Sequence, residues 1–131
     1  MSKLVCISGC SRGLGRAMAI EFHARGWKIA GGARDANALK KLKQKIGVTS
    51  FFHPFDVSKS TEVENFAIMV EKNLGIPDLL VNNAGVINQN APLTKISAAE
   101  FASVLAVNLG GIHNMIRSFV PRMEKQRHGI I

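Results

Sequence analysis

Apolar and polar positions along the chain follow two alternating periods. Short continuous apolar runs indicate buried strands, whereas apolar residues three and four positions apart indicate helices. The runs predict strands over residues 3–8, 27–32, 48–55 and 78–81, and a fifth strand that begins within 128–131. The helical spacing predicts four helices, over residues 13–26, 35–47, 61–75 and about 98–122.

Residues that favour helix ends support these limits. Asp35 suits the N-cap of the second helix. Thr61 with Glu64 and Ser97 with Glu100 have the separation of a capping box, so they predict the starts of the third and fourth helices. The glycines expected to end the first three helices are Gly26, Gly47 and Gly75.

The first, third and fourth helices have a defined apolar face. Asn108 falls on the face of the fourth helix, where a polar side chain needs hydrogen-bond partners. The pair Gly110-Gly111 lies inside the same helix, and each internal glycine costs about 1 kcal/mol relative to alanine, so we expect a local reason for it. The predicted faces are Leu14, Ala17, Met18 and Phe22 in the first helix, Val63, Phe66, Ala67, Val70 and Leu74 in the third, and Phe101, Leu105, Ile112, Ile116 and Phe119 in the fourth.

The alternation of strands and helices predicts an α/β fold. Continuous apolar strands are typical of a parallel sheet that helices cover on both faces, as in a Rossmann-type doubly wound fold. We expect residues 1–131 to form one such domain, truncated at the start of strand five. Strand four and the stripe of helix four would then be exposed apolar surfaces, which favour self-association.

Composition narrows the class of protein. Apolar residues make up 47% of the chain, enough for a sizeable core. Cys6 and Cys10 have neither a metal-binding nor a CxxC spacing, and no His, Cys, Asp and Glu set has metal spacing, so we expect no metal. No apolar run reaches membrane length and the amino terminus leaves no room for a signal peptide, so we expect a reduced, cytoplasmic protein.

A net charge of +8 can mean a nucleic-acid or small anionic partner, but it also fits an ordinary soluble surface, which we favour, so we expect no nucleic-acid and no membrane partner. The densest basic run, KKLKQK at residues 40–45, contains no aromatic residues and fits a solvated helix face. Binding to nucleic acid stays an alternative that only the charge supports.

The segment SGCSRGLG carries the main candidate chemistry. Gly9, Gly13 and Gly15 lie between a predicted strand and a predicted helix, where glycine lets the backbone turn sharply and approach a ligand. The N–H groups at the start of the helix would face a diphosphate. The spacing G-x-x-x-G-x-G differs from the general G-x-G-x-x-G dinucleotide fingerprint.

The end of the second strand selects between NAD and NADP. An acidic residue there holds the ribose hydroxyl of NAD, whereas an arginine suits the 2′-phosphate of NADP. The sequence has Ala33 and Arg34 there, with Arg12 in the glycine turn, so it favours NADP(H). Asp35 could repel the phosphate, but its position favours helix capping.

With these residues identified, the chain resembles the short-chain dehydrogenase/reductase family over essentially its whole length. SGCSRGLG resembles the family's T-G-x-x-x-G-x-G turn with Ser8 in place of Thr, and NNAG at residues 82–85 resembles its second signature. FDVS carries the pair Asp56-Val57, which resembles the segment against the adenine, and VNLGG places Asn108 at the family's helix-four Asn. Within the family, GIPDLLVNNAGVINQN, FVPRM and GII are similar to plant NADPH-dependent pterin aldehyde reductases.

The resemblance implies an activity as well as a set of binding residues. The family transfers hydride between the nicotinamide and a carbonyl or alcohol carbon of a small molecule, with Asn108 supporting a water-linked proton relay. A core role for Asn108, satisfying the irregular helix near Gly110-Gly111, remains compatible with this. The implied NADP(H) residues are Gly9, Ser11, Arg12, Gly13, Leu14, Gly15, Arg34, Asp56, Val57, Asn83, Ala84 and Gly85.

The rest of the family's catalytic set follows strand five. It comprises a Ser and a Tyr-x-x-x-Lys segment, and this sequence contains no Tyr. We therefore expect the chain to be the cofactor-binding half of a reductase, inactive alone, with roughly 100 or more residues missing. Full-length relatives commonly form dimers or tetramers through helix four. The alternative is a non-catalytic dinucleotide-binding or interaction module that ends at Ile131.

Overall fold

The fold is built on a four-stranded parallel sheet. The computed structural model describes residues 2–131. The strands are β1 (Leu4–Ser8), β2 (Lys28–Ala33), β3 (Ser50–Pro54) and β4 (Leu79–Val81), in the order β3-β2-β1-β4. Every pairing is parallel, so all carboxyl ends lie at one edge of the sheet. The four predicted strands are confirmed.

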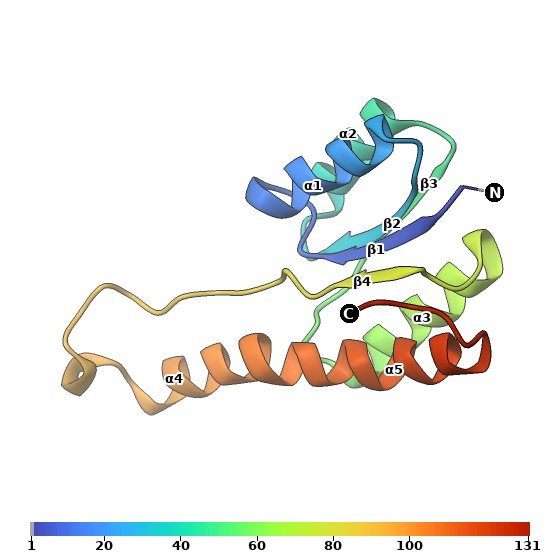
Figure 1. The fold of residues 1–131 in the computed structure, drawn as a ribbon. Coiled ribbons are helices and arrows are strands. Elements are labelled where there is room, and N and C mark those ends of the chain that lie inside the picture. Colours follow the sequence, from blue (N-terminus) through green and yellow to red (C-terminus); the bar gives the residue numbers. More distant parts are fainter. Residues whose placement is uncertain (1) are drawn as a thin grey trace.

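Helices cover both faces of this sheet. Figure 1 shows α1 and α2 on one face and α3 and α5 on the other, which confirms the predicted α/β architecture. The loop after β4 and α4 extend away from this body. The helices are α1 (Gly13–Ala24), α2 (Ala36–Ile46), α3 (Ser60–Leu74), α4 (Ala98–Leu105) and α5 (Gly111–Lys125), with a short 3₁₀ turn η1 at Leu93–Lys95.

The core has two apolar layers, one on each face of the sheet. Val5, Ile7 and Ile29 pack against α1 and α2. On the other face, Phe66 of α3 is fully buried and stacks on Phe55, with ring centroids 4.3 Å apart. Continuous burial on both faces explains why the strands are apolar runs without alternation.

The helix expected over residues 98–122 is interrupted and ends three residues later. Between α4 and α5 lies a π-helical segment, η2 (Ala106–Gly110), which contains Asn108. A π segment adds a residue to the helical turn and is often found at functional sites. The predicted local reason for Gly110-Gly111 is therefore present, and the contacts of Gly111 are described below.

The sequence predicted the N-caps of α2 and α4 correctly and the N-cap of α3 wrongly. The Asp35 carboxylate accepts from Ala38 N–H (3.0 Å), and Ser97 Oγ accepts from Glu100 N–H (3.1 Å). The capping box at Thr61 was wrong, because α3 starts one residue earlier and Lys59 occupies its N-cap.

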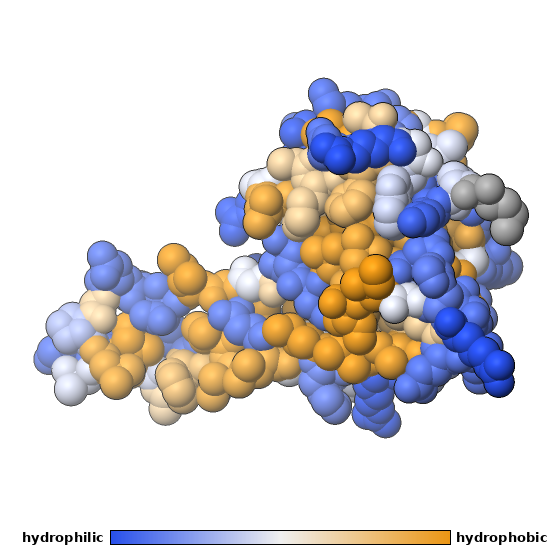
Figure 2. All heavy atoms as spheres, in the orientation of Figure 1, coloured by the Kyte–Doolittle hydropathy of each residue, from blue (hydrophilic) through white to orange (hydrophobic). Residues whose placement is uncertain are grey.

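The predicted apolar faces hold in part. Met18 and Phe22 of α1 pack against the core as predicted, whereas Leu14 is 70% exposed. The same helix also buries Gly15 and Ala19, because small residues let it lie close to the sheet. On the long helix, Phe119 is buried whereas Phe101 is 51% exposed, because α4 extends beyond the sheet. Figure 2 shows the apolar residues gathered along this helix and beside the C-terminal residues.

The last residues lie beside β4, as expected of a fifth strand. Ile130 N–H donates to Asp78 O and Leu80 N–H donates to Ile130 O, both at 2.9 Å, and Ile130 is bridged in parallel to Leu79. The outer edge of β4, expected to be uncovered, is therefore partly paired. Within residues 2–131 no helix has the length and apolar character to cross a membrane.

Replacing Phe66 tests the core between the sheet and α3. Phe66→Ala should lower the free energy of unfolding by about 3–5 kcal/mol, because it leaves a cavity beside Phe55 and Phe119. Urea unfolding followed by circular dichroism measures the change. Val48→Ala, at a position that is 93% exposed, is the control and should change it by no more than about 0.5 kcal/mol. Equal losses from the two variants would contradict the assigned core.

Candidate functional site

A cavity of about 470 Å³ lies at the carboxyl edge of the sheet. In open parallel sheets, this edge is where ligands bind. The walls come from the ends of all four strands and from η2. The lining residues are Gly9, Ser11, Arg12, Gly13, Ala33, Arg34, Asp35, Phe55, Asp56, Val57, Asn83, Ala84, Gly85, Val86 and Val107.

The turn between β1 and α1 requires glycine for reasons of geometry. Gly9 and Gly13 have φ values of +69° and +56°, a region that side chains disfavour. A Cβ on Gly9 would lie 2.7 Å from Ala84 Cα, and one on Gly15 would overlap Gly9 O and Asn83 Nδ2. Gly15 therefore acts by close packing behind the turn, and neither it nor the exposed Leu14 lines the cavity.

The start of α1 faces this cavity. Arg12 is its N-cap residue, with an extended backbone and no side-chain bond to the helix. The first N–H groups of a helix lack intrahelical partners and carry a partial positive charge. Because Arg12 and Gly13 both line the cavity, this helix end is placed to bind an anion.

Asn83 and Ser8 join the loop after β4 to the glycine turn. Ser8 is 2% exposed, and its Oγ accepts from Asn83 N–H (3.1 Å) and Ala84 N–H (3.0 Å). In return, Asn83 Nδ2 donates to Ser8 O (3.1 Å) and Gly9 O (3.0 Å). These four bonds fix two walls of the cavity relative to each other.

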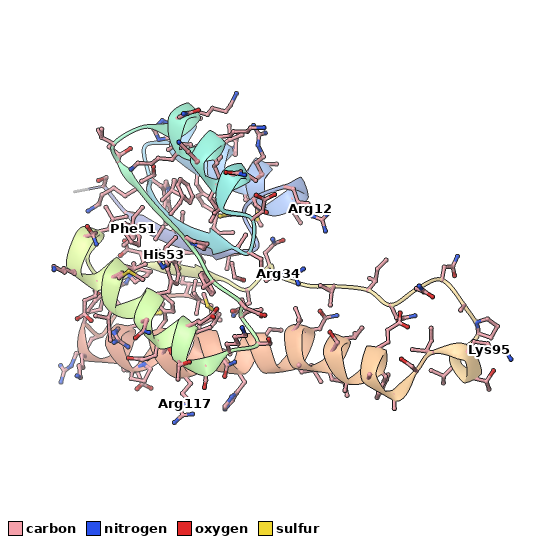
Figure 3. The ribbon with its side chains drawn as sticks, turned by 180° about the vertical axis from the view of Figure 1, so that it is seen from behind. Arg12, Arg34, Phe51, His53, Lys95 and Arg117 are labelled. Carbon is pink, nitrogen blue, oxygen red and sulfur yellow. The ribbon has the colours of Figure 1, made fainter. Side chains whose placement is uncertain are left out.

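Two arginines supply positive charge at the cavity. Arg34 follows β2, and Figure 3 shows it and Arg12 on the side of the domain from which the loop after β4 extends. Asp35 is the neighbouring opposite charge, but its carboxylate caps α2 as predicted. The charge balance therefore suits a phosphate group on the ligand.

Asp56 supplies a carboxylate at the opposite wall. Its Oδ1 accepts from Ser58 N–H (2.9 Å) and Ser58 Oγ (2.7 Å). Partial burial acts to raise the pKa of Asp56, but the two Ser58 bonds and the nearby charges of Arg34 and Lys59 outweigh it and lower the pKa. The group is thus an ionised hydrogen-bond acceptor at neutral pH.

Asn108 holds the backbone of the loop after β4. Its Oδ1 accepts from Val86 N–H and its Nδ2 donates to Val86 O, both at 2.8 Å. The amide therefore pairs with another segment, and the expected core role of satisfying its own irregular helix is replaced by this contact. Because Val86 lines the cavity, Asn108 acts on its shape.

The predicted cofactor-binding residues converge, with two exceptions, and Asn108 lies outside the lining of the cavity. All of the predicted cofactor residues except Leu14 and Gly15 line the cavity. Phe55, Val86 and Val107 also line the cavity and were not predicted to do so, because apolar residues at strand and helix ends give the same sequence signal as core residues. Within residues 2–131, no three His, Cys, Asp or Glu side chains are placed to hold a metal ion.

Together these features fit a phosphorylated dinucleotide. The Gly-rich turn leaves space that a Cβ would fill, the helix end suits a diphosphate, and the arginines suit a further phosphate. The anionic Asp56 is suited to accept from an amino group.

Comparison with known proteins gives one consistent family. The family model for short chain dehydrogenases matches residues 3–131. The chain is 36% identical over 132 residues to the NADPH-dependent pterin aldehyde reductase of Arabidopsis thaliana, covering 99% of this chain and 54% of that protein. It therefore spans about half the length of that relative.

Solved structures share the fold. An alcohol dehydrogenase from the archaeon Thermococcus sibiricus, complexed with 5-hydroxy-NADP, superposes with a TM-score of 0.89 at 34% identity, covering 98% of this chain and 56% of that one. The 3-ketoacyl-(acyl-carrier-protein) reductase of Brucella melitensis, complexed with NADH, gives 0.92 at 27% identity, covering 95% and 51%.

Replacing Ser8 tests the link between the two cavity walls. Ser8→Ala should lower the free energy of unfolding by about 2–4 kcal/mol, because two buried N–H groups lose their acceptor. Ser8→Thr keeps the hydroxyl and should stay within about 1 kcal/mol of the parent protein. Denaturant unfolding measures both, and equal stability of the alanine and parent proteins would refute the role given to the hydroxyl.

Proposed function

The chain belongs to the short-chain dehydrogenase family, and from that premise we propose that it is the cofactor-binding part of an NADP(H)-dependent oxidoreductase. The observation that carries the proposal is the cavity in which the start of α1 meets Arg12 and Arg34. The whole protein would reduce a carbonyl group of a small molecule to an alcohol.

The preference for NADP(H) rests on the residues after β2. Arg34 lines the cavity where an NAD-specific site would have a free carboxylate, and Arg12 of the glycine turn lines the same cavity. Asp35 is committed to the cap of α2. The Arabidopsis relative named for NADPH and the Thermococcus structure with an NADP derivative support this assignment. The Brucella structure with NADH makes a direct comparison of the two cofactors the decisive test.

The proposed reaction divides between the cofactor and the protein. When bound, the nicotinamide supplies or accepts the hydride. The residues of this chain bind the phosphates at α1 and Arg34, hold Asp56 toward the ligand and fix the loop after β4 through Asn108. We also propose that Asn108 supports a proton relay. Its amide is bonded at both ends to Val86, so that role would use its backbone or a water beside it.

We propose that the proton donor and substrate pocket belong to a longer form of the protein. The sequence has no Tyr, the residue that donates the proton in the family this chain resembles. A strand continuing from Ile130 in its parallel register would pass Asn82, whose buried Oδ1 has no hydrogen-bond partner within residues 2–131. The additional strand could supply the missing donor.

An exposed apolar stripe along α4 and η2 supports a further part of the proposal. Phe101, Leu105 and Leu109 are 51%, 41% and 64% exposed. We propose that the longer protein forms a homodimer or homotetramer through this helix. The two cysteines are buried free thiols, which is consistent with a reduced, cytoplasmic protein.

The alternative is a non-catalytic module that binds a dinucleotide and ends at Ile131. The same cavity supports it, so the two functions differ in protein length and turnover. The nucleic-acid alternative still rests on net charge alone, and competition between NADPH and RNA for the protein would separate it.

Charge reversal at Arg34 tests the cofactor assignment. Arg34→Asp should weaken NADPH binding by at least about tenfold more than NADH binding, because only NADPH carries the 2′-phosphate. Fluorescence titration measures both affinities. Arg117→Asp is the control, because Arg117 is an exposed residue of α5 that does not line the cavity. Equal losses for the two cofactors would contradict an NADP(H) site.

The mass of the endogenous protein tests its proposed length. Immunoprecipitation through segment 40–45, where Lys40, Lys41, Gln44 and Lys45 are exposed, followed by intact mass spectrometry, should give close to twice 14.2 kDa. Carbonyl reduction with NADPH should then be measurable in that preparation. A mass of 14.2 kDa would favour the non-catalytic module instead.

A further inference from the structure

A single peptide group connects α5 to the Asp56 carboxylate. Asn114 of α5 donates from Nδ2 to Val57 O at 2.8 Å. The N–H of the same peptide group belongs to Ser58, and it donates to Asp56 Oδ1 at 2.9 Å. Because a peptide group is planar and rigid, fixing its carbonyl also fixes the direction of its N–H.

The packing of α5 reinforces this connection. Gly111 lies so close to Val57 that a Cβ would come within 2.6 Å of Val57 Cγ2. Val57 itself is only 8% exposed. Gly111 and Asn114 are one helical turn apart, so the same face of α5 meets the Val57 side chain and its carbonyl. The segment that presents Asp56 to the cavity is thus supported from behind by two residues of a distant helix.

We propose that Asn114 is a positioning residue that sets the preference of the site for adenine over other purines. The proposal rests on the NADP(H) function proposed above. Asn114 does not line the cavity and so would not contact the ligand. It holds the peptide between Val57 and Ser58, and that peptide directs the Asp56 carboxylate.

The chemistry of Asp56 explains why its orientation selects the base. Both bonds from Ser58 end on Oδ1, which leaves Oδ2 free of them to accept a further hydrogen bond. The 6-amino group of adenine is a donor and pairs with such an acceptor. The 6-oxo group of hypoxanthine is an acceptor and is repelled by it.

The bond from Asn114 also strengthens the donor on the other side of the peptide. A hydrogen bond to a carbonyl polarises the peptide and makes its N–H a better donor. The other charged groups at the segment are Arg34, Lys59 and Glu62, and Glu62 Oε2 accepts from Asp56 N–H at 2.8 Å. These groups hold the backbone of Asp56 or act on its charge, whereas Asn114 reaches the carboxylate only through the Ser58 N–H.

The test compares two Asn→Leu variants of the protein at its natural length. Asn114→Leu removes the donor and keeps a similar side-chain size. Asn73→Leu is the matched control, because Asn73 is exposed and also donates its amide to a backbone carbonyl, that of Met69 (2.7 Å). The probes are NADPH and its analogue with hypoxanthine in place of adenine, whose affinities are measured by titration.

Parent protein and the Asn73 variant should prefer NADPH to the analogue. Asn114→Leu should reduce that preference by about threefold to tenfold, mainly through weaker binding of NADPH, as expected for loss of a well-directed hydrogen bond to a charged acceptor. An unchanged preference would overturn the proposal. Asn114→Ala gives the same comparison should the leucine disturb folding.

A ligand-free measurement separates this inference from the proposed function. The pKa of Asp56, followed by carbon NMR of its carboxyl group, should rise toward its ordinary value in the Asn114 variants and stay low in the Asn73 variant. An unchanged pKa would overturn the positioning role even if NADPH binds. If the pKa of Asp56 rises in the Asn114 variants but the parent protein does not bind NADPH, the positioning role stands and the NADP(H) function is refuted.

Discussion

The hydrogen bonds between Ser8, Gly9 and Asn83 are the constraint on which the rest of the site depends. They join the turn after β1 to the loop after β4, two segments more than seventy residues apart in sequence. With these bonds in place, Gly9 can approach Ala84 and Gly15 can pack behind the turn, where no Cβ would fit. The start of α1 then faces the cavity. A buried network of this kind is costly when incomplete, so it defines a single arrangement of the two segments.

Sequence patterns located the segments of this site but not the contacts between them. The apolar runs and glycine punctuation identified all four strands, and Asp35 and Ser97 identified two helix starts, because these signals act over a few residues. The error at Leu14 has a different origin. Helical spacing indicates which residues share a face, whereas the distance between α1 and the sheet selects Gly15 and Ala19 as the buried ones. Asn114 gave no sequence signal, because its partner Val57 lies 57 positions away.

The helix that carries Asn108 and Asn114 supports the cavity from two sides. Asn108, in the π segment η2, pairs with both backbone groups of Val86 after β4. Asn114 bonds Val57 after β3. The extra residue in a π turn changes the direction of the residues that follow it. This change lets the consecutive elements η2 and α5 each direct one amide to a different loop, and the close approach at Gly111 requires the absence of a side chain.

The same helix therefore has two faces with different requirements. One face orders two loops at the cavity, which costs conformational entropy that its contacts must offset. The other face exposes Phe101, Leu105 and Leu109, whose apolar surface gains free energy when it is covered. A partner that covered this stripe would hold α4 and η2 in place, and through Asn108 it would also hold Val86. Assembly and cofactor binding would then stabilise the same conformation, so each would favour the other by thermodynamic linkage.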